Sequence, residues 1–257
     1  DRWVGVVDNA ELDGKRRDDT ERVFVLWGSQ PHSSKAAHGG HGLVDARSNL
    51  GVKSVVVDPY LTAEAAKADV WLPVRPGSDC ALMLSWIRYI IENKLYDEDF
   101  CKRWTNLPYL IDTDTKKMLR AYEVGLGEAD AEDAEKTFVV WDQKTNSAKA
   151  LPWPYDEALD PAFFGTYEID GVEYPTAFTL LQERVDEWTL EKGCEVCCLE
   201  KDQVEKAIRI YAENAPSGLV LGVATDMSPQ SAQGTEGACI LEFLLGNVEK
   251  PGALLQR

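Results

Sequence analysis

The sequence predicts an α/β fold in which a parallel sheet is flanked by helices, with β-hairpin insertions later in the chain. Apolar runs of strand length, such as 23–27 and 53–58, alternate with segments of helical periodicity. Each of these runs continues into a short polar turn that contains Gly or Pro. The runs are apolar throughout, which is typical of strands that are covered on both faces in a parallel sheet.

Size and composition limit the possible partners. The chain has 257 residues, of which 44% are hydrophobic, enough for one large domain or two ordinary ones. Its formal net charge of −17 would repel nucleic-acid phosphate and anionic membranes, so we expect neither as a partner. No apolar run approaches the ~20 residues that cross a bilayer, so direct membrane insertion is not expected. The chain starts at Asp1 and not at a methionine, so the absence of a targeting signal does not indicate a compartment. The compartment of the parent protein is left open.

The first part of the chain alternates strands and helices. After a short strand at 3–7, the sequence predicts strands at 23–27, 53–58 and 70–74. A helix is expected from Ser33 or Ser34, which are good N-cap residues, toward Asn49, and a short one at 62–68. A longer helix begins at Asp79, where apolar residues recur at spacings of three and four, and another spans 98–104.

The second part contains hairpins as well as helices. Residues 137–147 predict one hairpin, and Asp170-Gly171 between β-forming residues predicts another. Helices are expected at 177–188, 201–214 and 233–245, and a buried strand at 218–223 is followed by a polar loop at 224–228. We expect one domain in residues 1–95 and part of an adjoining α/β domain, with the hairpin insertions, in residues 96–257.

The sequence does not favour a metal site or a catalytic centre. Cys194, Cys197 and Cys198 form a cluster, but no second pair follows at ligand spacing, so we expect ordinary thiols. His38 and His41 have no acid at the neighbouring turn to complete a ligand set. The chain contains neither a Gly-x-Ser-x-Gly elbow nor a Gly-x-x-x-x-Gly-Lys loop, so we predict no catalytic residue and no metal ligand.

Binding is better supported than catalysis. Asp58 ends an apolar strand, and an acid at that edge of a parallel sheet can accept hydrogen bonds from both ribose hydroxyls. The turn that begins at Gly28 offers backbone N–H groups to phosphate, although it lacks the Gly-x-Gly-x-x-Gly fingerprint, which disfavours an NAD-dependent dehydrogenase. Asp79 could accept two N–H bonds from a guanine edge, or it could merely cap its helix. One acidic residue at the ribose and another at the base would together indicate a guanosine nucleotide. The alternative is an ordinary sheet edge that binds no ligand.

Four motifs resemble one protein family in order and spacing. They are LWGSQP (26–31), VVDP (56–59), ADVWLPVRPGSD (68–79) and LLGNVEKPG (244–252). They resemble the central part of the molybdopterin oxidoreductases of the dimethyl sulfoxide reductase family, and the resemblance covers the chain from about Val23 onward. Segments 164–172 and 222–226 look most like the branch that contains acetylene hydratase, pyrogallol transhydroxylase and the catechol dehydroxylases.

The resemblance implies a cofactor and its ligands. It implies that residues 1–95 form a Rossmann-like domain and that the chain binds bis(molybdopterin guanine dinucleotide) with molybdenum or tungsten. The residues that it assigns to the cofactor are Gly28, Ser29 and Gln30 along the pyrophosphate with Ser33 or Ser34 nearby, Asp58 and Pro59 at the ribose, Gly77 and Asp79 at the guanine, and Thr225 and Asp226 toward the other pterin and the substrate.

Several family features differ or are missing. Relatives often carry Asn where Gln30 stands, Arg for Tyr60, Thr for Ser78 and Gly for Ala253, and Tyr60 removes a permanent cation. The family's iron–sulfur cysteines, metal-ligating residue and carboxy-terminal cap have no counterpart in these residues. We therefore expect a fragment that cannot turn over substrate by itself, with any iron–sulfur cluster in the missing amino-terminal part.

The expected parent protein performs redox chemistry, dehydroxylation or hydration of a small molecule at the metal. Its expected partners are an iron–sulfur electron-transfer subunit, together with the rest of its own catalytic subunit. A non-catalytic nucleotide-binding module, or a structural subunit of a redox complex, is the alternative.

Overall fold

The computed structural model describes residues 23–34, 41–152 and 155–248, and they form two compact units. The first unit combines the described residues of Asp1–Tyr96 with those of Trp188–Arg257, and the second unit is Asp97–Glu187. The strand expected at 3–7 lies outside the described residues. Among the described helices, none is long and apolar enough to cross a membrane.

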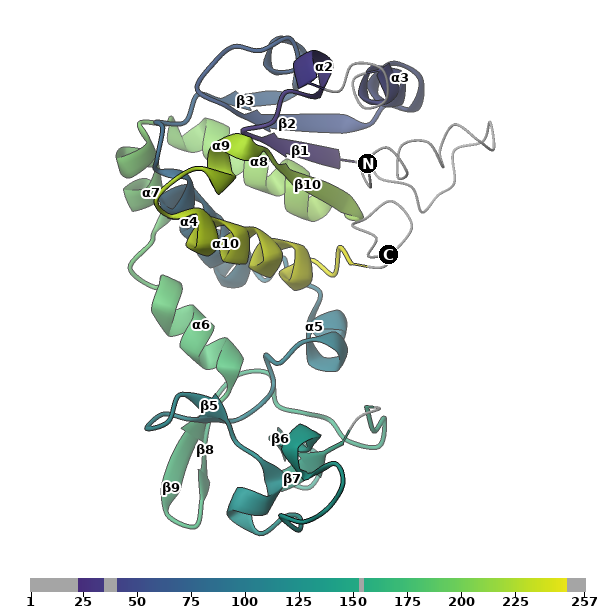
Figure 1. Ribbon diagram of the computed structural model, residues 1–257, viewed down its shortest axis with the longest axis vertical. Helices are drawn as coiled ribbons and strands as arrows, with labels where there is room; N and C mark the ends of the chain where they lie inside the picture. The colour runs from purple at the N-terminus through teal and green to yellow at the C-terminus, as the bar shows by residue number, and fades with distance from the viewer. Residues whose placement is uncertain (1–22, 35–40, 153–154, 249–257) are drawn as a thin grey trace. The chain divides into compact units, whose positions relative to one another are not determined.

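A parallel four-stranded sheet forms the centre of the first unit. Its strands are β1 (Val23–Trp27), β2 (Lys53–Val57), β3 (Val70–Leu72) and β10 (Ser217–Leu221), in the order β10-β1-β2-β3 (Figure 1). Trp27 pairs with Val57 and Leu221, and Val57 pairs with Leu72, so all the strands end at one level. The predicted α/β class with a parallel sheet is confirmed.

The position of β10 changes the expected division of the chain. This strand pairs with β1 along its whole length, although the hairpin insertions separate the two in sequence. Residues 188–248 therefore complete the sheet that residues 23–96 begin, whereas the sequence suggested a single boundary near residue 95. The assignment of nucleotide binding to one domain stays a prediction.

Helices cover both faces of the sheet. On one side lie α2 (Pro31–Ser34) and α3 (His41–Leu50), and Ala65 of the 3-10 turn η2 (Ala65–Lys67) belongs to the same buried cluster as Leu43 of α3. On the other lie α4 (Asp79–Glu92), α7 (Leu190–Cys197), α8 (Lys201–Glu213) and α10 (Ser231–Leu244), while α9 (Val223–Asp226) follows β10 (Figure 1). The helix expected from Ser33 to Asn49 is described as α2 and α3, and residues 35–40 between them lie outside the described residues.

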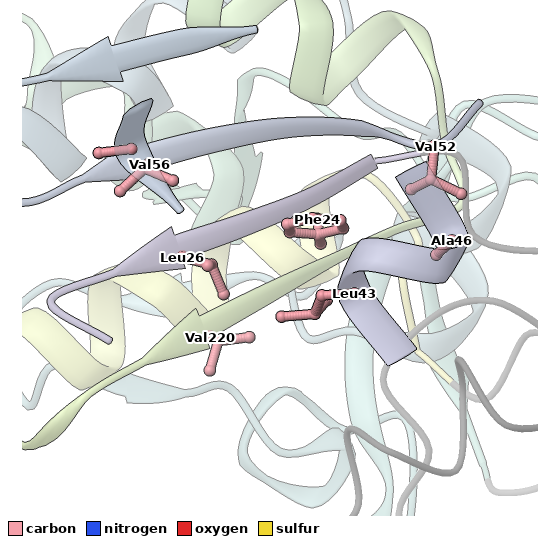
Figure 2. Close-up of a cluster of buried hydrophobic side chains, with 8 residues drawn as sticks. Phe24, Leu26, Leu43, Ala46, Val52, Val56 and Val220 are labelled. Carbon is pink, nitrogen blue, oxygen red and sulfur yellow. The ribbon is translucent and has the colours of Figure 1, made fainter. Parts of the chain in front are cut away.

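Side chains that alternate along the strands form a buried core on each face of the sheet. Figure 2 shows Phe24 and Leu26 of β1 beside Leu43 of α3 and Val220 of β10, in one buried cluster. Trp27 faces the other side, where its ring lies against Trp86 of α4 with centroids 5.4 Å apart. Successive side chains of a strand point to opposite faces, so β1 contributes to both cores.

Helix α7 was not predicted. It begins after Thr189, whose side chain accepts a hydrogen bond from the Lys192 N–H at 3.2 Å. Its midpoint is Gly193, a poor helix former, which hid the helix in the sequence. That glycine is required by packing, because a Cβ there would lie 2.5 Å from the Ser85 side chain of α4. Tertiary contact therefore decides a helix that local propensity does not favour.

The second unit contains the predicted hairpins. They are β6 (Phe138–Asp142) with β7 (Ser147–Leu151) and β8 (Thr166–Ile169) with β9 (Val172–Pro175), and the helices are α5 (Glu98–Trp104) and α6 (Ala177–Val185). Asp170 and Gly171 both have positive φ, of 50° and 82°, as a two-residue hairpin turn requires. A third hairpin, β4 (Ile111–Asp112) with β5 (Lys117–Met118), was not predicted, because its strands are too short to show alternation. The 3-10 turns η3 (Ala121–Val124) and η4 (Ala134–Lys136) complete the unit.

Candidate functional site

The carboxyl ends of the sheet strands bring the predicted site residues to one edge. Because the strands are parallel and end at one level, the segments that follow them share that edge. The predicted residues are distributed as Gly28, Ser29, Gln30, Ser33 and Ser34 after β1, Asp58 and Pro59 after β2, Gly77 and Asp79 after β3, and Thr225 and Asp226 after β10. The strand order reverses between β1 and β10, and this is where ligands bind in open α/β sheets.

In the turn after β1, some hydrogen-bond donors have no partner among the described residues. Gly28 has φ of 60°, and its N–H donates to the Val57 carbonyl at 2.8 Å. The N–H groups of Ser33 and Ser34 both donate to the Gln30 carbonyl at 3.1 Å, and the Ser34 hydroxyl donates to it at 3.0 Å. Within the described part of the chain, the N–H groups of Ser29 and Gln30 and the Ser33 hydroxyl have no hydrogen-bond partner. The free donors therefore belong to Ser29, Gln30 and Ser33.

The start of α9 packs directly on this turn. The Gly222 N–H donates to the Trp27 carbonyl at 2.8 Å, and a Cβ at Gly222 would lie 1.8 Å from the Gly28 carbonyl oxygen. Thr225 is 3% exposed, and its hydroxyl donates to the Gly222 carbonyl at 2.7 Å. The Thr225 hydroxyl hydrogen is thus used in a bond inside the protein. The predicted role of Thr225 toward a cofactor stays a prediction. The side chain of Asp226, the other residue predicted here, lies outside the described part of the structure.

Asp58 lies in a loop that the protein holds firmly. Its N–H donates to the Leu72 carbonyl at 3.1 Å, and its own carbonyl accepts from the Trp71 indole at 2.8 Å. Its Oδ1 accepts from the Tyr60 N–H at 2.8 Å. No described residue bonds to Oδ2, so this half-buried carboxylate keeps an oxygen for a ligand while its backbone is fixed.

Asp79 makes a bond that the sequence did not suggest. Its Oδ1 accepts from the indole Nε1–H of Trp27 at 2.8 Å. It stands in the first turn of α4, yet its carboxylate accepts no amide hydrogen of that helix among the described hydrogen bonds. Asp79 therefore places a carboxylate in the first turn, where the helix dipole favours it, without accepting any described N–H of the helix. Gly77, two residues earlier, has φ of 81° and open space where a side chain would stand.

Helix α7 supports the turn that presents Asp79. The Arg75 N–H donates to the Cys197 carbonyl at 3.1 Å, and the Cys197 thiol contacts the Ser78 carbonyl at 3.5 Å. The Ser78 hydroxyl closes the turn by donating to the Arg75 carbonyl at 2.7 Å. In the sequence Cys197 is only one thiol of a cluster, and no local signal links it to residues 75–78.

The cysteine cluster is mostly buried. Cys194 and Cys197 are buried and Cys198 is exposed. Burial raises the pKa of Cys194 to about 11, so it is a thiol at neutral pH. Among residues 23–34, 41–152 and 155–248, no group of three or more His, Cys, Asp or Glu side chains is arranged to hold a metal. His38 lies outside the described residues.

Comparisons identify relatives along most of the chain. A putative dimethyl sulfoxide reductase catalytic subunit from Halobacterium salinarum is 34% identical over 199 residues, which cover 77% of this chain and 23% of the relative. Dopamine dehydroxylase from Eggerthella lenta is 41% identical over 93 residues, which cover 36% of this chain and 9% of that protein. No protein-family model matches.

A solved structure has the same fold. Acetylene hydratase from Pelobacter acetylenicus aligns with a TM-score of 0.53 and 21% identity, over 95% of this chain and 25% of that one. The chain thus spans a quarter or less of the length of these proteins. The relatives agree with the family that the motifs at 26–31, 56–59, 68–79 and 244–252 predicted. The chain therefore belongs to the dimethyl sulfoxide reductase family of molybdopterin oxidoreductases.

Proposed function

We propose that the carboxyl edge of the sheet binds the guanosine diphosphate end of a molybdopterin guanine dinucleotide, within a molybdenum or tungsten oxidoreductase. The observation that carries this proposal is the convergence, at one sheet edge, of two carboxylates and a turn with free N–H groups. The whole protein would perform redox chemistry, dehydroxylation or hydration of a small molecule. The names of the relatives, a reductase and a dehydroxylase, support this range.

The described residues fit such a ligand. The free N–H groups of Ser29 and Gln30 suit the pyrophosphate, and the Ser33 hydroxyl can add a donor. Asp58 Oδ2 suits the ribose hydroxyls, and the Asp79 carboxylate suits the paired donors of guanine. When bound, the cofactor would supply the metal at which the substrate reacts. The residues of this chain hold and orient it.

Exposed side chains at the carboxyl edge of the sheet also indicate a contact with another part of the protein. Tyr60, Leu61, Val223 and Met227 are exposed apolar or aromatic side chains, and all of them follow the carboxyl ends of β2 or β10. Large exposed apolar side chains along one edge of a sheet suit a surface that another protein part or a ligand covers. We propose that the rest of the catalytic subunit covers this edge together with the cofactor. A separate iron–sulfur subunit is a further candidate partner, and any iron–sulfur cluster would lie outside this chain.

Analysis of the purified holoprotein tests the proposal. Acid treatment should release guanosine monophosphate, and elemental analysis should find molybdenum or tungsten. Asp79→Asn should lower the guanosine content, because an amide cannot accept both guanine donors, while its oxygen still accepts from Trp27. Glu132→Gln, at an exposed acid of the second unit, should leave the content unchanged. Recovery of an adenine nucleotide, or full guanosine content in Asp79→Asn, would contradict the assignment.

A further inference from the structure

We infer that Trp27 is a positioning residue, which fixes the Asp79 carboxylate for the guanine edge and thereby sets the choice of base. This inference rests on the proposed function. Trp27 is the last residue of β1, is 0% exposed, and donates its indole N–H to Asp79 Oδ1 at 2.8 Å. A hydrogen bond from a buried donor to a carboxylate is stronger than one between neutral groups, so it restricts how the carboxylate turns.

The donor itself is held in place. The Trp27 ring meets Trp86 edge-on at an interplanar angle of 63°, and Trp86 lies 5.8 Å from the Tyr211 ring. The Tyr211 hydroxyl donates to Glu242 Oε1 at 2.7 Å. All four side chains are buried, and they come from β1, α4, α8 and α10. The Trp27 indole cannot rotate unless this part of the core repacks.

A fixed carboxylate discriminates between bases. Guanine presents N1–H and a 2-amino group side by side, and both can donate to one carboxylate only when its two oxygens lie near the plane of the base. Oδ1 spends one lone pair on Trp27 and keeps another, while Oδ2 has no partner among the described residues. Adenine offers an acceptor at N1, and hypoxanthine lacks the 2-amino group. Loss of the Trp27 bond should therefore weaken selectivity for guanine over both.

Trp86 provides a matched control. It is as deeply buried as Trp27 and belongs to the same aromatic contact. Its indole Nε1 makes no hydrogen bond within the described part of the chain. Trp27→Phe and Trp86→Phe thus remove the same atoms from one core, but only the first removes a bond to Asp79.

Calorimetry with the cofactor-free, full-length protein tests the inference. Kd would be measured for the diphosphates of guanosine, inosine and adenosine. Trp27→Phe should weaken guanosine diphosphate binding roughly tenfold and reduce its preference over inosine diphosphate. Trp86→Phe should lower Tm through the same loss of packing, without the loss of a hydrogen bond, and leave that preference as in the wild type. An unchanged preference in Trp27→Phe would overturn the inference and leave the guanine role of Asp79 intact. A wild-type protein that binds adenosine and guanosine diphosphates equally would refute the proposed function itself.

A second pair of variants leaves Trp27 untouched and covers the case in which Trp27→Phe does not fold. Asp79→Asn keeps an acceptor for the indole, so its Tm should stay near that of the wild type. Asp79→Ala leaves the buried N–H without a partner, so its Tm should fall by several degrees. Equal melting temperatures for the two variants would show that the Trp27 bond does not hold Asp79.

Discussion

Asp58 and Asp79, the two carboxylates at the sheet edge, each use one oxygen in a hydrogen bond within the protein and leave the other without a partner among the described residues. Asp58 gives Oδ1 to the Tyr60 N–H, and Asp79 gives Oδ1 to the Trp27 indole. In each case Oδ2 has no partner among the described residues. An acid held through one oxygen is already oriented when a ligand arrives, so less conformational entropy is lost on binding.

At the residue scale, Gly222 is predicted to be irreplaceable. A Cβ there would lie 1.8 Å from the Gly28 carbonyl oxygen, a backbone atom that cannot move aside without breaking the β1 edge. Gly222→Ala should therefore destabilise the fold by more than about 3 kcal/mol, as judged by urea unfolding. Gly234→Ala is the control, because its Cβ would meet only the Cys80 sulfur at 3.7 Å and alanine favours the helix. Similar stabilities for the two variants would contradict the close contact.

Glu242 predicts a dependence of stability on pH. Burial raises its pKa to about 8, against an ordinary value of 4.5, so the folded chain keeps a proton that the unfolded chain releases. The stabilisation is complete below the unfolded pKa, declines by about 1.4 kcal/mol per pH unit between the two pKa values, and is lost above the folded one. Glu242→Gln keeps a neutral side chain that can accept from Tyr211.

The variant should remove that decline. Urea unfolding between pH 5 and pH 9 should show a wild-type stability that falls toward high pH, and a Glu242→Gln stability that stays nearly level over the same range. The variant should also be the more stable protein above the folded pKa. A wild-type curve that stays level, or rises, between pH 5 and pH 8 would mean that Glu242 is not held in its protonated form.

At the element scale, α7 is predicted to support nucleotide binding from a distance. Thr189 caps this helix, and the helix end holds Arg75 through the Cys197 carbonyl. Thr189→Ala should cost about 1 kcal/mol of helix stability. The loosened 75–78 turn should then weaken guanosine diphosphate binding, which calorimetry would measure.

Helix α6 supplies the control for this prediction. Thr176 caps it in the same way, accepting from the Thr179 N–H at 3.2 Å, but it belongs to the second unit. Thr176→Ala also loses a bond to the Phe163 carbonyl, so its effect on stability should be at least as large. Nucleotide affinity should nevertheless remain at the wild-type value. A loss of affinity in Thr176→Ala equal to that in Thr189→Ala would show a general effect of instability.

At the scale of the whole molecule, the two units are predicted to differ in how they tolerate deletion. Residues 97–187 form a continuous segment with its own hairpins, whereas the sheet unit needs both ends of the chain. Replacing 97–187 by a flexible linker should leave a protein that melts cooperatively and retains helical circular dichroism. Ending the chain at residue 187 removes β10 and exposes the edge of β1, so that protein should not fold. The reverse pattern would contradict the division.

Net charge acts at the same scale. A chain with a formal charge of −17 would repel the proposed anionic nucleotide at long range, so the proposed site depends on backbone N–H groups at short range. Tyr60 is neutral at a position where the family is expected to carry Arg, so under the proposed function this edge has one cation fewer to offset that repulsion.

Local patterns in the chain were enough to predict the α/β class, the strands β1, β2 and β10, the start of α4 and the position of two acids at the carboxyl edge. These features depend on short-range patterns: β-branched runs, turns with Gly or Pro, and helical spacing of apolar residues. The family also followed from the sequence, because its four motifs are contiguous stretches. Features that depend on neighbouring residues could therefore be predicted from the sequence.

Contacts between residues far apart in the sequence could not be predicted and became known from the fold. The Trp27 bond to Asp79 joins positions 52 residues apart, and the Cys197 contact with Ser78 joins positions 119 apart. The place of β10 beside β1 and the contact of Gly222 with Gly28 are equally non-local. Such contacts depend on strand order and on the packing of helices over the sheet, which no window of neighbouring residues encodes. The positions of Asp58 and Asp79 at the sheet edge were therefore predictable from the sequence, and the fold showed which groups hold the two side chains.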